Sequence, residues 1–364
     1  MTERTPDVAL VSPTYFAPES VIGGGERYVG ELARALADRM EVRFISFGRT
    51  ALRERPAPGL ERVVLRSWTR DTMTPFSPRL ARELRGIPVV HAFQYHTLST
   101  FLACWLGHRQ GSRVFVTDLG GGGWTPAYHI DQSRWIDGYL PISRYAARGL
   151  PGRALPCSVL YGGVDTVKFA MRSAVEHDGS VVFLGRLLPH KGIHFLIEGL
   201  PEDVPLHVIG PGGDAAYLDR LHQLAAGKQV HFHHGLSDGE VITYLQRAMA
   251  LVHPTPTDEG GSAGVAELFG LALVEAMACG CPVIASRAAS LPEIVDDGVS
   301  GYLVAPNDPA GIARAMRDLS RSPDQWTRLS LAARLRVESS FTWAATGRTA
   351  AACYAGHPPP SAAP

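Results

Sequence analysis

The stretch ELFGLALVEAMACGCPVIAS, residues 267–286, contains a helix followed directly by a strand. Its dense apolar residues predict a helix that begins near Gly270, and Val283–Ser286 predicts a short strand. That strand is apolar at consecutive positions, which favours a parallel sheet covered on both faces. The stretch therefore predicts an α/β fold in which helices connect parallel strands.

The same alternation of strands and helices continues along the chain on both sides of this stretch. In the second half we expect strands at Val181–Leu184, Leu206–Ile209, Val230–Phe232, Ala250–His253, Val283–Ser286 and Tyr302–Val304. In the first half we expect strands at Val8–Ser12, Val42–Phe47, Arg62–Leu65, Val89–Phe93, Arg113–Thr117, Gly138–Ile142 and Ser158–Tyr161. Helices are expected at Glu26–Asp38, Pro309–Ser320, Gln325–Ser339 and Trp343–Tyr354. Two rounds of this alternation predict two doubly wound, Rossmann-like domains.

The length of 364 residues suits two domains better than one. We expect residues 1–165 to form the first domain and residues 175–340 the second, with the join in the aperiodic stretch between Val164 and Gly179. A helix within residues 341–356 is expected to return and brace the first domain. The Pro- and Ala-rich residues 357–364 are expected to be disordered.

Composition excludes several classes of protein. The 35 Lys and Arg residues balance 35 Asp and Glu residues, so charge does not favour nucleic acid or an anionic membrane as the main partner. The start MTERTPDVAL lacks the layout of a signal peptide, and the apolar stretch Leu268–Ile284 is too short and interrupted to span a bilayer. Five cysteines without zinc or redox spacing favour reduced thiols. We therefore expect a cytoplasmic protein.

A run of three glycines, Gly23, Gly24 and Gly25, precedes the helix expected at Glu26–Asp38. Glycines at a helix N-terminus let backbone N–H groups approach a phosphate. The run fits the dinucleotide fingerprint poorly, because it comes late after the strand and no acidic residue follows at the required spacing. A flexible loop without a ligand is the alternative.

The sequence GRLLPHKG, residues 185–192, follows the strand expected at Val181–Leu184. It places two cations, Arg186 and Lys191, where the carboxyl end of a parallel strand meets a ligand cleft. Lys191 lies near a helix start, where the dipole disfavours a cation, so a bound anion would explain it. Arg and Lys can neutralise a leaving diphosphate without a metal. A pair of solvated surface cations is the alternative.

Two glutamates, Glu267 and Glu275, flank the start of the helix near Gly270. Even on one continuous helix they would stand roughly 12 Å apart, at 1.5 Å per residue. That separation exceeds both carboxylate spacings used by glycosidases and excludes a hydrolytic pair. The two carboxylates could instead bind two ends of one elongated ligand. Glu275 lies among apolar residues and needs hydrogen-bond donors, which sugar hydroxyls or a neighbouring Arg would supply.

Taken together, these motifs resemble glycosyltransferase family 4, a group of retaining enzymes with the two-domain GT-B fold. The matching pieces in the second half are FLGRLLPHKG, ELFGLALVEAMACGCPVIAS and LPEIVDDGVSGYLVAPND. Those in the first half are PTYFAPESVIGGGERYVGELARAL, SRYAARGL and YGGVDTVKF, and FTWAATGRTAAACY is similar to the closing helix of the family. The resemblance covers nearly the whole chain.

The resemblance implies a role for each motif. Arg186 and Lys191 would bind the diphosphate of a nucleotide-sugar donor, together with N–H groups of Gly23, Gly24 and Gly25. Glu275 would bind the ribose, and Glu267 the transferred sugar. The implied donor-binding residues also include the backbone of Phe269, Gly270 and Leu271. The second domain would hold the donor and the first the acceptor, with no metal and no cofactor.

One departure from the family concerns the loop after the strand Arg113–Thr117. The family usually carries a Thr-x-His pattern there, with the histidine beside the reacting centre. This chain has Leu119 at that place, after Asp118. Asp118 is our candidate for the role of the missing histidine.

Other polar residues invite weaker hypotheses. His231 and His233 share one face of a strand and could chelate a metal, but nothing close in sequence completes a site. His91 and His96 could line the acceptor side. Six arginines between Arg49 and Arg70 form a basic stretch, which we interpret as a solvated face, with docking to an anionic acceptor or a peripheral membrane contact as the alternative.

The leading hypothesis is sugar transfer with retention, in which the acceptor attacks the face that the diphosphate leaves. A nucleotide-sugar epimerase also uses two such domains, but would need acid and base groups that the sequence does not reveal. A nucleotide-sugar or glycan-binding protein that has lost activity is the third hypothesis, motivated by Leu119. The sequence leaves the nucleotide base, the sugar, the acceptor and the oligomeric state open.

Overall fold

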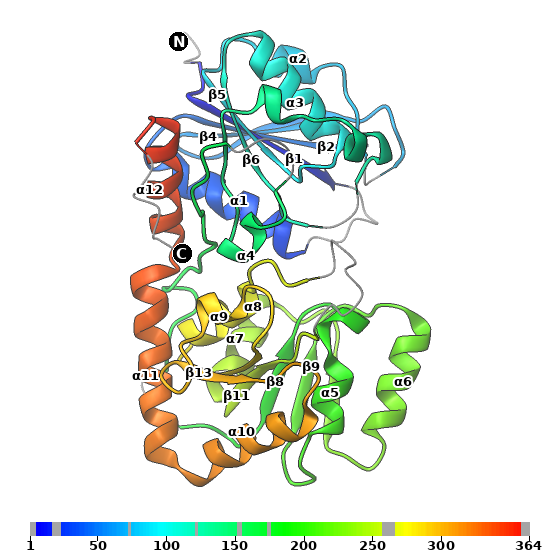
Figure 1. Cartoon of the computed structure of the whole chain (residues 1–364), viewed down its shortest axis with the longest axis vertical. Coiled ribbons are helices and arrows are strands. Elements are labelled where there is room, and N and C mark those ends of the chain that lie inside the picture. Colours follow the sequence, from blue (N-terminus) through cyan, green and yellow to red (C-terminus); the bar gives the residue numbers. More distant parts are fainter. Residues whose placement is uncertain are drawn as a thin grey trace. The chain divides into compact units, whose positions relative to one another are not determined.

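The computed structural model describes residues 5–16, 23–71, 74–120, 123–150, 155–172, 176–256 and 266–357. The chain divides into two compact units. Unit 1 comprises Met1–Gly162 and Trp343–Pro364, and unit 2 comprises Gly163–Thr342 (Figure 1). Residues 358–364, the tail for which we expected disorder, lie outside the described ranges.

Unit 1 contains a seven-stranded sheet in the order β3-β4-β2-β1-β5-β6-β7. Its strands are β1 (Val8–Phe16), β2 (Val42–Gly48), β3 (Leu52–Ala57), β4 (Leu60–Arg66), β5 (Val89–Phe93), β6 (Arg113–Thr117) and β7 (Gly138–Tyr139). Its helices are α1 (Gly24–Ala37), α2 (Leu80–Glu83), α3 (Leu98–Arg109), η1 (Thr125–His129), η2 (Ser133–Trp135), α4 (Arg144–Ala147) and α12 (Trp343–Tyr354). Neighbouring strands are parallel except β3, which runs antiparallel to β4.

Unit 2 contains a six-stranded, wholly parallel sheet in the order β10-β9-β8-β11-β12-β13. Its strands are β8 (Val181–Leu184), β9 (Leu206–Ile209), β10 (Val230–His233), β11 (Ala250–His253), β12 (Val283–Ser286) and β13 (Gly301–Val304). Its helices are η3 (Pro189–Lys191), α5 (Ile193–Glu198), α6 (Ala215–Ala225), α7 (Asp238–Arg247), α8 (Leu271–Ala278), α9 (Leu291–Ile294), α10 (Pro309–Arg321) and α11 (Pro323–Ser340). The strand order reverses between β8 and β11, which makes the carboxyl ends of these strands the expected ligand crevice.

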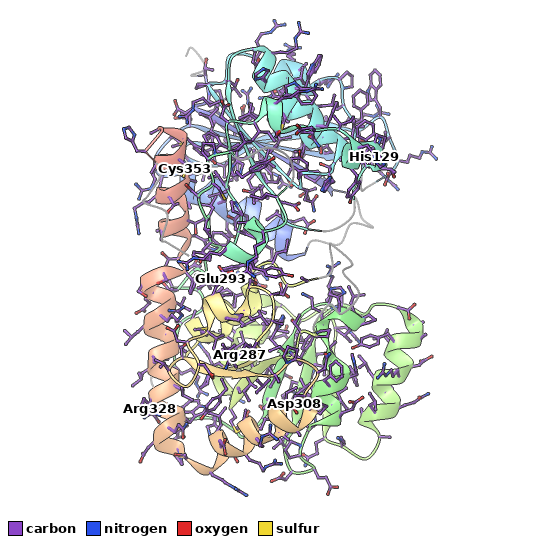
Figure 2. The ribbon with its side chains drawn as sticks, viewed as in Figure 1. His129, Arg287, Glu293, Asp308, Arg328 and Cys353 are labelled. Carbon is purple, nitrogen blue, oxygen red and sulfur yellow. The ribbon has the colours of Figure 1, made fainter. Side chains whose placement is uncertain are left out.

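Most strands of both sheets are buried because helices cover both faces; the edge strands β3 and β10 are more exposed. Val181, Val182 and Phe183 are fully buried in β8, as the run of apolar residues predicted. Helix α10 begins where the Asp308 carboxylate accepts the Gly311 N–H at 2.8 Å, with Pro309 as its first residue (Figure 2). In the described part of the chain, no helix combines the length and apolar character needed to cross a membrane.

Helix α12 packs against α1 within unit 1 (Figure 1). The ring centroids of Tyr28 and Trp343 lie 5.5 Å apart, edge to face. A Cβ at Gly347 would lie 2.8 Å from the Ala35 carbonyl oxygen, so only glycine allows this close approach of the two helices. The chain therefore leaves unit 2 after Thr342 and completes unit 1 with its last helix.

One expected strand is absent from the structure, and one observed strand was not expected. Ser158–Tyr161 is not a strand, although the Ser158 N–H donates to the Tyr139 carbonyl at 3.1 Å beside β7. Strand β3 was not predicted, because its sequence LRERPA lacks the apolar run on which the other assignments rested. As an edge strand with charged side chains, β3 needs no such run.

Candidate active site

The loop after β8 is held in place by a glycine contact. Gly192 has a φ of 68°, in the left-handed region that favours glycine. A Cβ at this position would lie 1.9 Å from the carbonyl oxygen of Pro254, just after β11. Only glycine therefore lets the loop close on the carboxyl end of β11. This contact brings Lys191, the last residue of η3, next to that strand end.

The loop before α8 is anchored by a buried serine. The Ser290 hydroxyl, which is fully buried, lies 2.7 Å from the Glu267 carbonyl oxygen and 3.0 Å from that of Phe269. Gly270 has a φ of 107° and begins α8 without a side-chain cap. Glu267 therefore lies in the loop and Glu275 in the second turn of the helix, as the sequence predicted.

These loops bring Lys191, Glu267 and His253 together at the carboxyl edge of the sheet in unit 2. The Glu267 Oε2 atom accepts hydrogen bonds from the Lys191 ammonium and, at 2.9 Å, from His253 Nε2. The side chains of Lys191 and Glu267 are only 16% and 15% exposed. The other ring nitrogen of His253, Nδ1, is buried without a partner among the described residues.

The electrostatics of this cluster keep Glu267 ionised. Burial alone would raise the pKa of its carboxyl group. The Lys191 ammonium and the hydrogen bond from His253 outweigh that effect and hold the pKa well below its usual range. Glu267 is therefore a hydrogen-bond acceptor at any physiological pH, and it does not act as an acid.

The remaining polar residues of the β8 loop differ in exposure and charge. Arg186 is exposed and forms no ion pair with a described residue. His190 has its pKa lowered to about 4 by burial and by the positive charges of Lys191 and Arg186, so it is neutral at pH 7. With respect to the described residues, the loop thus presents one guanidinium without an ion pair and one ammonium that is paired with Glu267.

Glu275 is buried on α8, with 7% of its surface exposed. It has an interaction partner in the structure and is not an isolated buried charge. Its charge contributes to raising the pKa of Cys279, after the larger effect of burial. Cys279 and Cys281 are both buried, as a structural role predicts.

In unit 1 the glycine-rich start of α1 lies beside the loop after β6. A Cβ at Gly25 would lie 3.5 Å from the Leu119 side chain. Gly23 precedes the helix, and its N–H donates to the Glu26 carboxylate at 2.8 Å. The Asp118 Oδ1 atom accepts the N–H of Tyr95 at 3.3 Å and that of Gly120 at 3.4 Å.

The structure corrects the expectation for His91. His91 is fully buried, with Nε2 2.8 Å from Thr117 Oγ1 and Nδ1 2.6 Å from the Tyr354 hydroxyl. Burial lowers its pKa to about 3. His91 therefore joins the sheet to α12 and does not line an acceptor site. His96 instead stacks on the half-exposed Tyr128 ring, at 4.0 Å between centroids.

The histidines of β10 make contacts with β9. His233 Nε2 lies 3.0 Å from His207 Nδ1, and the rings of His207 and His231 stack at 5.4 Å. Within the described ranges, no group of three His, Cys, Asp or Glu residues has an arrangement that could hold a metal ion.

The chain is similar to members of known protein families. Residues 22–168 match the model of Glycosyltransferase Family 4, and residues 168–336 match that of Glycosyl transferases group 1. The chain belongs to the group 1 glycosyltransferases. The family that the sequence motifs indicated is therefore confirmed.

Curated relatives of the chain match it over part of their length. One relative, from Mycolicibacterium smegmatis, is named GDP-mannose-dependent alpha-(1-6)-phosphatidylinositol monomannoside mannosyltransferase. It is 32% identical over 234 residues, covering 59% of each chain. A glycogen synthase of Mycobacterium tuberculosis is 31% identical over 213 residues, covering 56% of this chain and 49% of the relative. The chain thus spans about half the length of the curated relatives it matches.

Solved structures share the fold over nearly the whole chain. Sucrose-phosphate synthase from Thermosynechococcus elongatus has a TM-score of 0.73 at 21% identity, covering 96% of this chain and 98% of its own. HepE from Anabaena in complex with UDP has a TM-score of 0.74 at 18% identity, covering 96% of this chain and 100% of its own. The GT-B fold predicted from the sequence is confirmed.

Proposed function

We propose that this protein transfers a sugar from a nucleotide-diphosphate sugar to an acceptor hydroxyl, with retention of the anomeric configuration and without a metal or cofactor. The proposal depends most on one observation, the cluster of Lys191, Glu267 and His253 at the carboxyl edge of unit 2. Arg186 lies in the same loop as Lys191 and is exposed.

The positive charge in this loop supports a diphosphate site. Cleavage of the sugar–phosphate bond leaves additional negative charge on the diphosphate, which fixed cations stabilise in the transition state. Arg186 offers a free guanidinium, and guanidinium groups bind phosphate oxygens in bidentate fashion. Lys191 shares its charge with Glu267 in the ligand-free chain, so a bound diphosphate would compete with that carboxylate for the ammonium.

Glu267 fits a role in holding the transferred sugar. Its carboxylate stays ionised and accepts hydrogen bonds from Lys191 and His253 through Oε2. Each carboxylate oxygen has further acceptor capacity, which sugar hydroxyls would use. Glu275, buried on α8, would bind the ribose of the same donor.

The proposed step needs no covalent intermediate with the protein. The acceptor oxygen forms a bond to the anomeric carbon on the face that the diphosphate leaves. The bond between that carbon and the phosphate oxygen breaks, and its electron pair stays on the oxygen. The acceptor proton passes to the departing phosphate oxygen. Alpha linkages in the name of the Mycolicibacterium relative support retention, because an alpha product from an alpha-linked donor keeps its configuration.

We assign to Arg186 and Lys191 the positive charge that a metal ion supplies in metal-dependent transferases. Metal-dependent transferases hold Mg²⁺ or Mn²⁺ with carboxylates, often paired aspartates. The adjacent aspartates Asp296 and Asp297 are engaged otherwise. Asp297 pairs with Arg287 at 2.5 Å and Asp296 with Arg336 at 2.7 Å.

The nucleotide is best identified by thermal shift with UDP, GDP, ADP and TDP. A ligand at 100 times its dissociation constant stabilises by about 2.7 kcal/mol, which is enough to rank the four. HepE was solved in complex with UDP and with UDP-glucose, and the Mycolicibacterium relative is named as GDP-mannose-dependent, so UDP and GDP are first choices.

The decisive test compares Lys191→Ala with Lys168→Ala, using donor turnover with an acceptor panel or slow donor hydrolysis. Lys168 is the matched control because its pair with Asp238 is exposed. We expect Lys191→Ala to lose roughly 10²–10³ in kcat, as for other preorganised donors, and Lys168→Ala to be unchanged. Wild-type activity should persist in excess EDTA, and NMR should show that the transferred sugar has the same anomeric configuration in the product as in the donor. Activity abolished by EDTA and restored by Mn²⁺, or an inverted product, would overturn the mechanism.

A further inference from the structure

Unit 1 contains a pocket of about 530 Å³ whose lining is almost entirely charged. Its lining residues are Arg43, Arg53, Arg79, Arg82 and Glu83. They come from β2, β3 and the turn of α2, which are far apart in the sequence. We refer to it as the arginine pocket.

Two of these arginines form a fixed network with two carboxylates. Arg43 Nε lies 2.6 Å and Arg53 Nη1 2.7 Å from the Glu61 carboxylate. Arg53 Nη2 lies 2.6 Å from Glu83, and Arg43 also donates to the Glu83 carbonyl oxygen at 2.9 Å. Arg43 and both carboxylates are largely buried, at 7–15% exposure. These ion pairs hold Arg43 and Arg53 in place, so this side of the pocket is preorganised.

The other two arginines are not neutralised. Arg79 and Arg82 are exposed and form no ion pair with a described residue. They stand three positions apart, and the Arg82 N–H donates to the Arg79 carbonyl oxygen at 3.0 Å, so one turn presents both charges. Like charges at this spacing repel one another. With four guanidinium groups against Glu61 and Glu83, the arginine pocket keeps two positive charges in excess.

Within unit 1, the arginine pocket lies at the opposite end of the sheet from the segments that contain Gly25 and Leu119. Arg43 and Glu61 are opposite one another at the second residues of the parallel strands β2 and β4. Gly25 and Leu119 belong instead to segments that follow the carboxyl ends of β1 and β6. The pocket is therefore a separate feature of unit 1, and its function does not depend on the proposed sugar transfer.

We propose that the arginine pocket binds the phosphate group of a small phosphorylated molecule. Guanidinium groups bind phosphate oxygens in bidentate fashion, and two uncompensated positive charges match a phosphate monoester dianion. The pocket volume lies in the range of small-molecule sites, so there is room for a body attached to the phosphate. A soluble phosphate monoester and the headgroup of phosphatidic acid share this chemistry.

The test measures binding of glycerol phosphate by calorimetry, in a Lys191→Ala background that weakens phosphate binding in unit 2. Arg79→Ala/Arg82→Ala removes the two free charges. Arg66→Ala/Arg85→Ala is the matched control, since both residues are exposed and neither lines the pocket. We expect the pocket variant to bind at least tenfold more weakly, as the loss of charge-assisted hydrogen bonds implies, and the control to be unchanged.

A third variant, Glu83→Gln, should act in the opposite direction. It removes a negative charge beside Arg53 and should tighten binding, an outcome that a purely structural network would not produce. A parallel arm measures sedimentation with phosphatidylcholine vesicles that contain phosphatidic acid. Pocket-dependent binding to glycerol phosphate identifies a soluble ester as a ligand. Pocket-dependent binding to vesicles alone identifies a lipid headgroup. Equal binding of the pocket variant and its control in both arms, or no binding by the parent, would overturn the proposal.

Discussion

The substitution Glu267→Gln tests the charged cluster of unit 2 without changing its shape. The amide keeps an oxygen that accepts hydrogen bonds from Lys191 and His253, but it removes the negative charge. Lys191 is then a largely buried ammonium, 16% exposed, without its counter-ion. Breaking a buried ion pair by removing one partner costs about 3–5 kcal/mol. We expect the lower end, about 3 kcal/mol at pH 7, because the hydrogen bonds survive.

The pH dependence follows from the lowered pKa of Glu267. Its folded-state pKa lies below the value of about 4.3 for an unfolded glutamate. The stabilisation is therefore complete above that unfolded pKa and is lost as the pH falls toward the folded pKa. Because Gln does not titrate, the difference in unfolding free energy between wild type and variant should narrow between about pH 5 and pH 3.

Scanning calorimetry at several pH values measures this difference. For a unit of this size, about 3 kcal/mol lowers Tm by roughly 6–12 °C at pH 7. Glu338→Gln is the control, because Glu338 is 44% exposed in its pair with Arg334 and should contribute under about 1 kcal/mol. Equal Tm of Glu267→Gln and wild type at pH 7, or a difference that does not change with pH, would refute the reasoning.

Three further predictions concern other parts of the candidate site. Gly192→Ala should lower Tm and donor affinity far more than Gly227→Ala. Both glycines have a positive φ, but only a Cβ at residue 192 would collide with Pro254, so equal effects of the two substitutions would contradict this account. Glu275→Ala should mainly raise KM for the donor, with a smaller effect on kcat, and unchanged affinity for the nucleotide diphosphate would remove it from the ribose site. Asp118→Asn should lower kcat by roughly 10²-fold with nucleotide affinity kept, whereas an unchanged kcat would exclude it from the mechanism.

The fold was predictable wherever apolar runs mark buried parallel strands. The bounds expected for β5, β8 and β11 agree with the structure, because every residue of such a strand must be apolar or buried. Strand β3 was not predictable in this way. Its charged side chains belong to an edge strand, where Arg53 gains stability from Glu61 and Glu83 instead of from burial in a core.

The members of the candidate site were easier to predict than their contacts. Lys191 and Glu267 are 76 positions apart, and no local pattern indicates that their side chains meet. His253 was missed as a site residue, although a polar residue at the end of the apolar strand ALVH was a usable signal. Ser290 was also missed, since its role is to hold a backbone carbonyl and leaves no motif.

The loop after β6 has Leu119 in place of the family's histidine, but it still contains a polar side chain, that of Asp118. Asp118 is held only by two long hydrogen bonds from backbone N–H groups, at 3.3 and 3.4 Å, and forms no ion pair with a described residue. Its neighbour His96 is neutral at pH 7, because burial lowers its pKa by more than the Asp118 charge raises it. The Asp118 side chain thus keeps part of its acceptor capacity. In the transfer proposed above, the acceptor proton passes to the departing phosphate oxygen, so that step does not require the histidine that this chain lacks.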